Sequence, residues 1–423
     1  MTGGTAALTA QEFQHAEGTE DWRALGSMVS AWFSAPSHTA GAELVRRLAD
    51  QNVAVEPSVR ATGVRVDIVP AGRGLSTADV TAARTVSAEV AALGLVGDPA
   101  VLQTLRLTFD VRDRAAVPPF WATVLGYLPA GSDAIADPVR RNPSIRFQDR
   151  QEQRPRRNRL HLDAVTPQPV ARAALETVRG RGAGAIADHG FYATVADVEG
   201  NEVDLLPLED GADGWGEPDT EDWRLVFSAI ACYRADSPKS AARLAQAVAE
   251  LADEAGLPLG IDLRPGLVVL DTGKDLWEQD SGYRVLAARI QHTARALGFT
   301  ADVTGPRFIQ LGIDAADIPA VRRFWCAVLA YQEDPREGVT DIIDPRQLTM
   351  PLFFQPIDTT EIERLAQRNR IHLDAFVPGD QAQARVAAGL AAGGSLVSEE
   401  HAPFRWTLAD PEGNEVDISV SAH

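Results

Sequence analysis

The chain repeats its own sequence, and this repetition constrains the fold more than any other feature. Three strings occur twice in the same order: TEDWR at 19–23 and 220–224, RNR(L/I)HLDA at 157–164 and 368–375, and D-x-EGNEVD at 197–204 and 410–417. Unrelated sequences do not produce ordered matches of this kind, and an internal repeat sets the reading of the whole fold. We infer a gene duplication, so the two halves should share one order of elements.

The halves meet at residues 209–219, EDGADGWGEPD, where Gly, Asp and Pro and the lack of apolar periodicity indicate a linker. Each half divides again, near Val96–Pro99 and near Asp302–Pro306. A length of 423 residues agrees with several domains. The expected fold class is α+β, with two tandem repeats that each hold a small domain and then a larger one. The expected boundaries are 10–97, 101–208, 209–219 for the linker, 220–302 and 306–420.

Charge and cysteine content exclude several classes of protein. The formal net charge of −19 repels phosphate backbones and anionic lipid surfaces, so we expect neither nucleic acid nor a membrane as partner. The two cysteines, Cys232 and Cys326, lie in apolar stretches, which indicates a reducing compartment. The N-terminal residues lack the basic and apolar regions of a secretory signal, and no apolar stretch is long enough to span a membrane. We therefore expect a cytoplasmic protein.

The two smaller segments, 10–97 and 220–302, share the pattern strand, helix, strand, helix, with a short helix in front of the first. Ser76 is the expected N-cap of the last helix of the first copy, with Asp79 favouring its positive end. The expected ranges in the first copy are Trp22–Phe33, Thr39–Gln51, Gly63–Val69 and Ser76–Leu93, and those in the second are Trp223–Tyr233, Ser240–Ala255, Leu267–Asp271 and Gly282–Leu297.

This order, with Gly74–Asp79 opening the last helix, resembles the pterin-4a-carbinolamine dehydratase family. In that family a His-His-Pro run supplies acid–base chemistry, but here the matching places hold Val55-Glu56-Pro57 and Leu259-Gly260-Ile261. Without imidazoles that titrate near neutral pH, we expect degenerate dehydratase-like domains with no dehydratase activity. Packing, dimerisation or covering a neighbouring cleft are the roles that remain, and a homodimer is left open.

The two larger segments, 101–208 and 306–420, each contain two pieces in which a strand and a helix precede further strands. In the first segment the pieces begin with the strands Leu105–Val111 and Leu160–Val165. In the second segment they begin with Phe308–Ile313 and Ile371–Phe376.

Paired βαβββ modules, the phrase F-W-x-x-V-L at 120–125 and 324–329, and DPEGNEVD at 410–417 resemble the vicinal oxygen chelate superfamily, in its glyoxalase-like, bleomycin-resistance-like branch. The first copy departs from the last motif, with Val198 in place of Pro411. The resemblance implies that the two modules of a segment curl their sheets around a cleft. It also implies that a divalent metal ion binds to residues on the first and last strand of each module.

Aligning the strands by this resemblance places four side chains at the metal positions of each copy. They are Thr108, Gln148, His161 and Asp204 in the first copy and Gly312, Gln355, His372 and Asp417 in the second. The imidazoles, the carboxylates and the Gln amide oxygens are acceptable ligands for a divalent ion, whereas Thr108 is expected only to contact a substrate. Because Gly312 is expected opposite His372, with room for a ligand, the second copy is favoured.

Other residues are candidates for contact with a substrate. His189 and His401 recur just before matching strands, and Trp121 and Trp325 lie on the first helix of each segment, where aromatic residues are either core or a platform for a ligand. No nucleotide cofactor is expected, because Gly182-Ala-Gly184 follows a helix rather than a strand.

Two functions remain open, and the ligand is a small molecule in both. The first is an enzyme of the glyoxalase-like type that carries out metal-assisted isomerisation, lyase or related rearrangement of a small oxygenated metabolite. The second is metal-free binding of a small molecule or sequestration of an antibiotic, and a pure scaffold in which His161 pairs with Asp204 without a metal also fits the motifs.

Overall fold

The computed structural model describes residues 7–72 and 74–421. Residues 1–6, at the start of the segment expected to hold no secretory signal, lie outside them. The described residues form two compact units: one combines those up to Leu102 with Gly214–Pro306 and Ser421, and the other combines Gln103–Asp213 with Arg307–Val420. Each unit is built from both repeats, and the four domains expected from the sequence stay a prediction.

The first unit contains the two smaller segments. Its first copy comprises α1 (Ala10–Gln14), β1 (Trp22–Leu25), β2 (Met28–Ser34), α2 (His38–Asp50), β3 (Glu56–Arg60), β4 (Gly63–Ile68), α3 (Thr77–Leu93) and β5 (Val96–Gly97), followed by a 3-10 turn at Pro99–Val101. Its second copy comprises a 3-10 turn at Pro218–Thr220, β14 (Trp223–Val226), β15 (Ser228–Arg234), α6 (Pro238–Ala255), β16 (Gly260–Arg264), β17 (Leu267–Asp271), α7 (Leu276–Gln279), α8 (Gly282–Ala296) and β18 (Thr300–Ala301).

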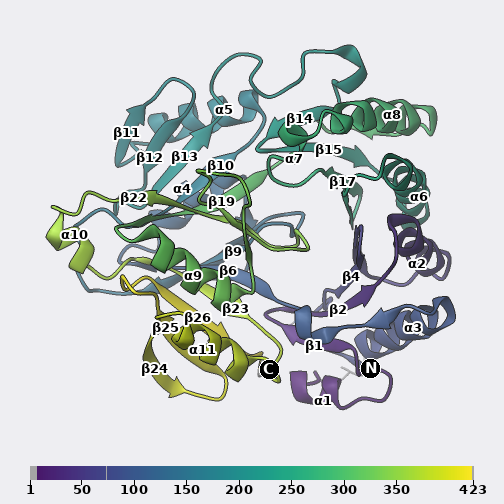
Figure 1. The fold of residues 1–423 in the computed structure, drawn as a ribbon, viewed down its shortest axis with the longest axis horizontal. Helices are drawn as coiled ribbons and strands as arrows, with labels where there is room; N and C mark the ends of the chain where they lie inside the picture. The colour runs from purple at the N-terminus through teal and green to yellow at the C-terminus, as the bar shows by residue number, and fades with distance from the viewer. Residues whose placement is uncertain (1–6, 73, 422–423) are drawn as a thin grey trace, which may run out of the picture. The chain divides into compact units, whose positions relative to one another are not determined.

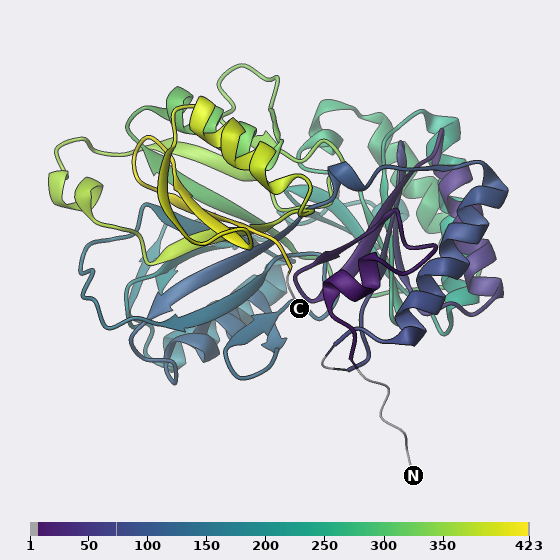
Figure 2. The same cartoon turned by 90° about the horizontal axis from the view of Figure 1, so that it is seen from below.

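These strands form one continuous sheet, sheet I, in the order β1-β2-β4-β3-β16-β17-β15-β14, with β5 on β2 and β18 on β15. The two copies join where β3 pairs antiparallel with β16. Beside this join the buried guanidinium of Arg60 lies 2.7 Å from the carboxylate of Asp262, so the charges of the joining strands neutralise each other. The helices α2, α3, α6 and α8 cover one face of the sheet (Figures 1 and 2).

The helices of the first unit agree closely with those expected, and the carboxylate of Asp79 accepts a hydrogen bond from the backbone N–H of Ser76 at 2.7 Å, as the predicted cap requires. The expected strands Trp22–Phe33 and Trp223–Tyr233 are instead hairpins. The turns contain Gly26 and Phe227, at φ 62° and 61°. Phenylalanine rarely adopts this left-handed conformation, so its presence gives no turn signal in the sequence.

The second unit contains the two larger segments. The first comprises β6 (Thr104–Val111), α4 (Val117–Leu125), β7 (Leu128–Pro129), β8 (Ala134–Ala136), β9 (Ser144–Asp149), β10 (Leu160–Val165), α5 (Gln168–Gly180), β11 (Ala185–Asp188), β12 (Ala193–Ala196) and β13 (Glu202–Leu206). The second comprises β19 (Phe308–Ala315), α9 (Ile318–Leu329), β20 (Gln332–Glu333), β21 (Ile342–Ile343), β22 (Leu352–Pro356), α10 (Ile362–Ala366), β23 (Ile371–Phe376), α11 (Ala382–Ala391), β24 (Ser395–His401), β25 (Arg405–Ala409) and β26 (Glu415–Ser419).

The modules of this unit pair across the repeats. Sheet II has the order β11-β12-β13-β10-β19-β22-β21-β20, and sheet III has the order β24-β25-β26-β23-β6-β9-β8-β7. Each sheet therefore joins a module of one copy to a module of the other, through the neighbours β10 and β19 or β23 and β6 (Figure 1). The resemblance implied that the two modules of one segment curl their sheets around a cleft, but each sheet here contains one module from each segment. The helices α4, α5, α9 and α11 pack with the apolar faces of both sheets in one hydrophobic core.

The repeated RNR string explains part of this cross-pairing. The buried side chain of Arg159 donates to Oδ1 of Asn414 at 3.0 Å, and that of Arg370 donates to Oδ1 of Asn201 at 2.9 Å. The backbone N–H of Arg159 donates to Oδ1 of Asn369, and the backbone N–H of Arg370 donates to Oδ1 of Asn158, both at 2.9 Å. We call this set of side chains the arginine–asparagine clasp. It binds the first copy to the second by hydrogen bonds within the second unit.

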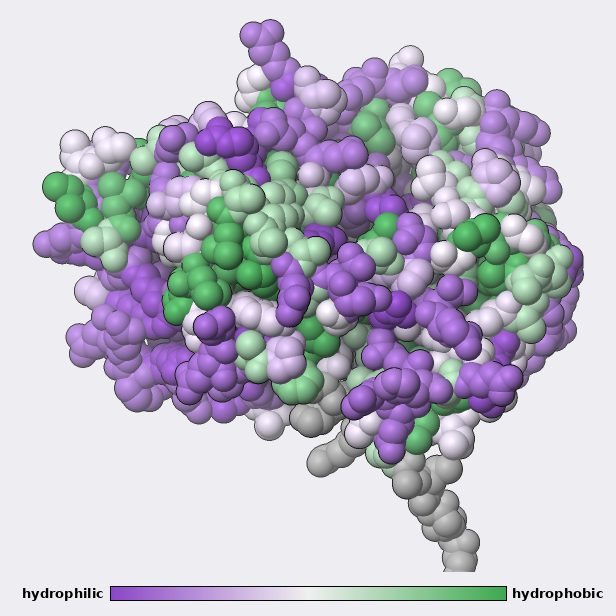
Figure 3. Space-filling model, turned by 60° about the horizontal axis from the view of Figure 1, so that its bottom comes forward, coloured by the Kyte–Doolittle hydropathy of each residue, from purple (hydrophilic) through white to green (hydrophobic). Residues whose placement is uncertain are grey.

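The surface carries both hydrophilic and hydrophobic residues. On the face shown in Figure 3, hydrophilic residues predominate and hydrophobic residues form patches between them. Among the residues that the structure describes, no helix is both long and apolar enough to cross a membrane.

Candidate functional site

One cluster of potential metal ligands lies on sheet II. His161 and Asp163 alternate with apolar residues on β10, so their side chains share one face of the sheet. Asp163 lies beside Asp204 in the parallel pair of β10 and β13, and Nε2 of His161 lies 3.8 Å from Oδ1 of Asp163. One ligand atom from each of these three residues, the His161 group, lies within 4.8 Å of the others. The structure therefore brings His161 and Asp204 together, as expected.

The surroundings of the His161 group fix its side chains. Oγ1 of Thr194, on β12, donates to Oδ1 of Asp204 at 2.6 Å. The His161 ring meets the Phe353 ring edge-on, with centroids 5.5 Å apart. Gly312 pairs with His161 across the antiparallel strands, and a Cβ atom on residue 312 would lie 2.4 Å from Cε1 of His161. The space above Gly312 is thus filled by the imidazole.

This placement corrects the expectation that Gly312 lies opposite His372 and leaves room for a ligand there. The residue opposite His372 is Thr108, because β23 pairs with β6. Oγ1 of Thr108 donates to Oδ2 of Asp374 at 2.9 Å, so the hydroxyl holds a carboxylate. The sequence argument that favoured the second copy therefore does not hold.

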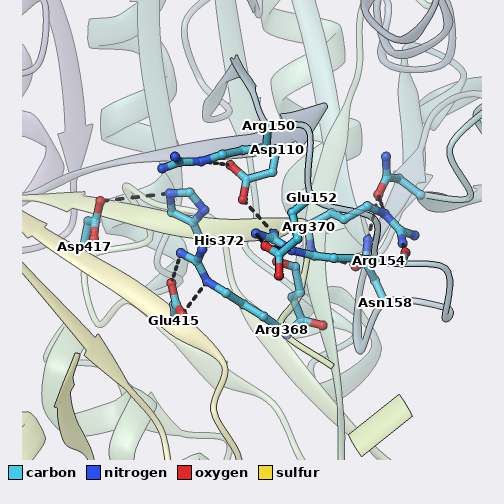
Figure 4. A network of polar contacts seen from close by, with 12 residues as sticks. Asp110, Arg150, Glu152, Arg154, Asn158, Arg368, Arg370, His372, Glu415 and Asp417 are labelled. Carbon is cyan, nitrogen blue, oxygen red and sulfur yellow. Dashed lines mark hydrogen bonds and ion pairs between the residues drawn. The ribbon is translucent and has the colours of Figure 1, made fainter. Parts of the chain in front are cut away.

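The second cluster lies on sheet III and repeats the first. His372 and Asp374 share a face of β23, and Asp417 lies beside Asp374 on β26. Nε2 of His372 lies 3.7 Å from Oδ1 of Asp374 and 4.0 Å from Oδ2 of Asp417. Figure 4 shows the side chains of His372 and Asp417 facing each other. One ligand atom from each of these three residues, the His372 group, lies within 4.8 Å of the others.

Burial and charge distinguish one carboxyl of the His372 group. Burial raises the pKa of Asp417, and the negative charge of Asp374 raises it further. The hydroxyl of Thr407 bonds Oδ1 of Asp417 at 2.5 Å, and Nε of Arg405 lies 3.8 Å from Oδ2; both oppose the rise without cancelling it. Asp417 therefore holds a proton at a higher pH than an exposed aspartate.

The glutamines are regrouped by the cross-pairing of the sheets. Gln148 on β9 lies next to β6 and so belongs to the sheet of His372, while Gln355 on β22 belongs to the sheet of His161. The expected sets, Gln148 with His161 and Gln355 with His372, are therefore wrong. Nε2 of Gln355 donates to Oδ1 of Asp314 at 2.6 Å. In the amide orientation that satisfies both ends of Gln148, its oxygen accepts hydrogen bonds from Arg150.

Sequence reasoning missed Asp163 and Asp374. The signal was present in the repeated HLD string, because residues two apart on a strand point to the same side. In both copies, this aspartate supplies the third ligand atom of the cluster. A role for Gln148 or Gln355 as a metal ligand stays a prediction.

The remaining candidates have different surroundings. His189 is exposed, stacks on Tyr192 with ring centroids 4.4 Å apart, and its Nε2 lies 3.4 Å from the Thr194 hydroxyl, so it is linked to Asp204 through that hydroxyl. His401 is also exposed and pairs with Arg405 across β24 and β25.

The two tryptophans lie in the core. Trp121 and Trp325 are fully buried, and their indole N–H groups donate to Asp197 at 2.9 Å and to Asp410 at 3.0 Å. These aspartates open the D-x-EGN turns, so the tryptophans attach a helix to a turn. The expectation that they contact a ligand is not supported, because their side chains expose no surface on which one could stack.

Two regions of the chain, residues 106–206 and 310–419, match the family model of the glyoxalase-like domain. A structural search matches a mutant glyoxalase I from Zea mays at 9% sequence identity and a TM-score of 0.38, covering 75% of this chain and 95% of that chain. No curated protein matches the sequence. The two regions belong to the glyoxalase-like domain family, which supports their place in the vicinal oxygen chelate superfamily. The dehydratase-like resemblance of the smaller segments stays a prediction.

The donor sets fit a divalent metal ion. Each offers one imidazole nitrogen and two carboxylate oxygens, which are ordinary ligands for zinc, manganese or iron. All three come from neighbouring strands of one sheet, and a threonine hydroxyl holds one carboxylate of each group in place.

Proposed function

We propose that the chain is a glyoxalase-like enzyme that binds a divalent metal ion at the His161 group and at the His372 group. The proposed reaction is isomerisation, lyase cleavage or a related rearrangement of a small oxygenated metabolite. The observation that carries this proposal is that one imidazole and two carboxylates converge twice, on the matching strands of two sheets. Three protein ligands leave coordination positions for a substrate.

A divalent ion, when bound, polarises a carbonyl or hydroxyl oxygen of the substrate. The chain's own residues hold the ligands in position: Thr194 bonds one oxygen of Asp204, and Thr407 bonds one oxygen of Asp417. The second oxygen of Asp417 is the one that lies nearest to His372. Thr407 therefore fixes which oxygen of Asp417 is turned toward the imidazole of His372.

Asp417 is also suited to taking up and releasing a proton. Burial raises the pKa of Asp417 when no ion is bound, so this role applies to the metal-free state, because a bound divalent cation lowers the pKa again. His372 lies 4.0 Å away, so an imidazole and a carboxyl are paired on the same face of sheet III. This pairing suits the removal of a proton from carbon or oxygen and its return elsewhere.

The second candidate function is metal-free binding of a small molecule, and one observation at the His372 group favours it. Arg106 lies 2.5 Å from Asp374, and Arg405 lies 3.8 Å from Asp417, so both carboxylates have a cationic partner from the chain itself. A cation from solution is less strongly attracted to carboxylates that are already paired.

Metal content separates the two functions. We expect the purified full chain, loaded with Mn²⁺ and desalted, to hold one ion for each of the two groups. His161→Ala and His372→Ala should each remove one ion, the double variant should remove both, and His292→Ala, on the exposed side of α8, should remove none. Metal content that does not respond to either site variant contradicts the enzyme proposal. Ligand binding that survives chelation would then support the second function.

For the first unit we infer a structural role without dehydratase activity. Glu56, at the place of the family's catalytic histidines, is largely buried in β3, and its carboxylate lies 3.9 Å from Nε of Arg264 on β16. It thus contributes to the join between the two copies. Turnover of a pterin carbinolamine above the uncatalysed rate, lost on substitution of Glu56, would contradict this role.

A further inference from the structure

The two groups differ in charge at matched positions around them. The register of the strands defines three such positions. The first lies opposite the aspartate of the HLD string, and the second lies beside Thr108 at the His372 group or beside Gly312 at the His161 group. The third lies two residues before Thr407 at the His372 group or before Thr194 at the His161 group. The matched pairs are Arg106 and Gln310, Arg146 and Phe353, and Arg405 and Tyr192. The His372 group therefore has a guanidinium at each position where the His161 group has an amide or an aromatic ring.

Arg106 and Arg405 are attached to the cluster and still accessible. Arg106 lies over the Phe376 ring, 4.8 Å from its centroid, and bonds Asp374, and 29% of its side chain is exposed. Arg405 is 40% exposed beside Asp417. A guanidinium carries five N–H donors in a planar fork, so these contacts leave donors for a ligand.

Arg146 lies on β9, two strands from the β23 strand of His372. It lies next to Thr108 in the parallel pair of β6 and β9, and Thr108 lies opposite His372. Neighbouring residues in register point to the same face of a sheet, so Arg146 shares the face of the imidazole. Its side chain is 41% exposed, with Nε 3.2 Å from Asp133.

We propose that the His372 group binds a small organic anion, whose carboxylate or phosphate is held by Arg106, Arg146 and Arg405, whereas the His161 group binds an uncharged ligand against Phe353 and Tyr192. This assignment rests on the proposed function, because it assumes that both groups bind small molecules. Oxyanions suit guanidinium forks, which bind them through paired, charge-assisted hydrogen bonds. With aromatic rings at the matched positions, the His161 group offers stacking surface instead of charge.

The test uses benzoate and its uncharged analogue benzamide as probes, titrated into the full chain and followed by ligand-observed NMR. We expect the double variant Arg146→Gln/Arg405→Gln to lower the affinity for benzoate by about tenfold or more, since charge-assisted bonds are lost. Its affinity for benzamide should not change. Arg284→Gln/Arg289→Gln is the matched control, because it removes the same two charges from exposed pairs on α8. Both arginines of the double variant are partly exposed, so folding should be retained, and a thermal melt checks this.

Equal loss of benzoate binding in the control and in the double variant would overturn the proposal, because binding would then follow net charge alone. Unchanged benzoate binding in the double variant, or absence of benzoate binding to the native chain, would also overturn it. Metal content is measured on the same samples. If metal content does not respond to the histidine variants but benzoate binding depends on the arginines, the enzyme proposal is contradicted and the anion proposal stands. If metal content responds but benzoate binding does not depend on the arginines, the anion proposal is contradicted and the enzyme proposal stands.

Discussion

Gly312 lies opposite His161, and a Cβ atom added to this glycine would come within 2.4 Å of Cε1 of the imidazole and 2.6 Å of the Phe353 ring. Only a residue without a side chain lets the two rings approach the backbone of β19. The glycine therefore sets the position of the histidine that the proposed metal site uses.

Gly312→Ala should displace the His161 ring. We expect a loss of about 1–3 kcal/mol in the free energy of unfolding, as for other overpacked sites, and loss of one bound Mn²⁺. Gly180→Ala is the control, because nothing lies within 4 Å of a Cβ atom at that position. Chemical denaturation and metal analysis measure both effects. Full metal content in Gly312→Ala would show that the added methyl group does not displace the His161 imidazole from the ion.

We expect Asp163 and Asp374 to bind the metal ion directly, as His161 and His372 are proposed to do. Replacing either carboxylate with an uncharged amide, in Asp163→Asn or Asp374→Asn, should weaken Mn²⁺ binding at its own group by about tenfold or more and leave the other group intact. Asp219→Asn, in an exposed turn, serves as the control. Isothermal titration with Mn²⁺ measures the affinities. If both amide variants bind as the native chain does, the third ligand has been misassigned.

Much of the local structure could be predicted from the sequence, since it depends on short patterns. A strand was predicted at Leu160–Val165, and the structure confirms it with the same bounds. The convergence of His161 with Asp204, and of His372 with Asp417, is confirmed as well. The metal that these residues are proposed to hold stays a prediction.

The pairing of modules could not be predicted. After a duplication, β10 finds similar strand edges in β6 and in β19, so the apolar pattern alone does not choose between them. The backbone N–H of Asp314 donates to the carbonyl of Arg159 at 2.7 Å, and that of Asp110 donates to the carbonyl of Arg370 at the same distance. Such backbone bonds follow from the pairing and do not select it. Arg106, which binds Asp374, was missed for a related reason, because it belongs to the other repeat.

The arginine–asparagine clasp should contribute strongly to stability. The buried guanidinium of Arg159 donates to Asn414 and to the carbonyls of Arg364, Leu365 and Gln367. Lysine carries a charge but cannot satisfy these acceptors from one planar fork. We expect Arg159→Lys to lower the free energy of unfolding by about 3 kcal/mol, as when a buried charged group loses its partners.

Arg370→Lys should have a similar effect, because Arg370 occupies the matched place in the clasp. Arg368→Lys is the control, since this side chain is 43% exposed in its pair with Glu415 and such pairs contribute at most about 1 kcal/mol. Urea denaturation compares the three variants. A clasp variant no less stable than the control would show that the cross-pairing does not depend on these bonds.

In the first unit, Asp253 of α6 should make stability depend on acid pH. Burial acts to raise its pKa, but hydrogen bonds from Thr39 and His38 outweigh burial and hold the pKa at about 2. The carboxylate accepts from the backbone N–H of both residues, at 2.9 and 3.0 Å, and thus satisfies the start of α2. Because the pKa is lower in the folded chain than in the unfolded chain, this stabilisation is present above about pH 4. This stabilisation is lost as the pH falls toward 2.

We expect Asp253→Asn to lower the free energy of unfolding by about 1 kcal/mol at pH 7 and to reduce the fall of that free energy between pH 4 and pH 2. Glu250→Gln, an exposed position on the same helix, should leave both unchanged. Urea denaturation at several pH values measures the slopes, and an Asp253→Asn slope equal to that of the native chain would contradict the assignment.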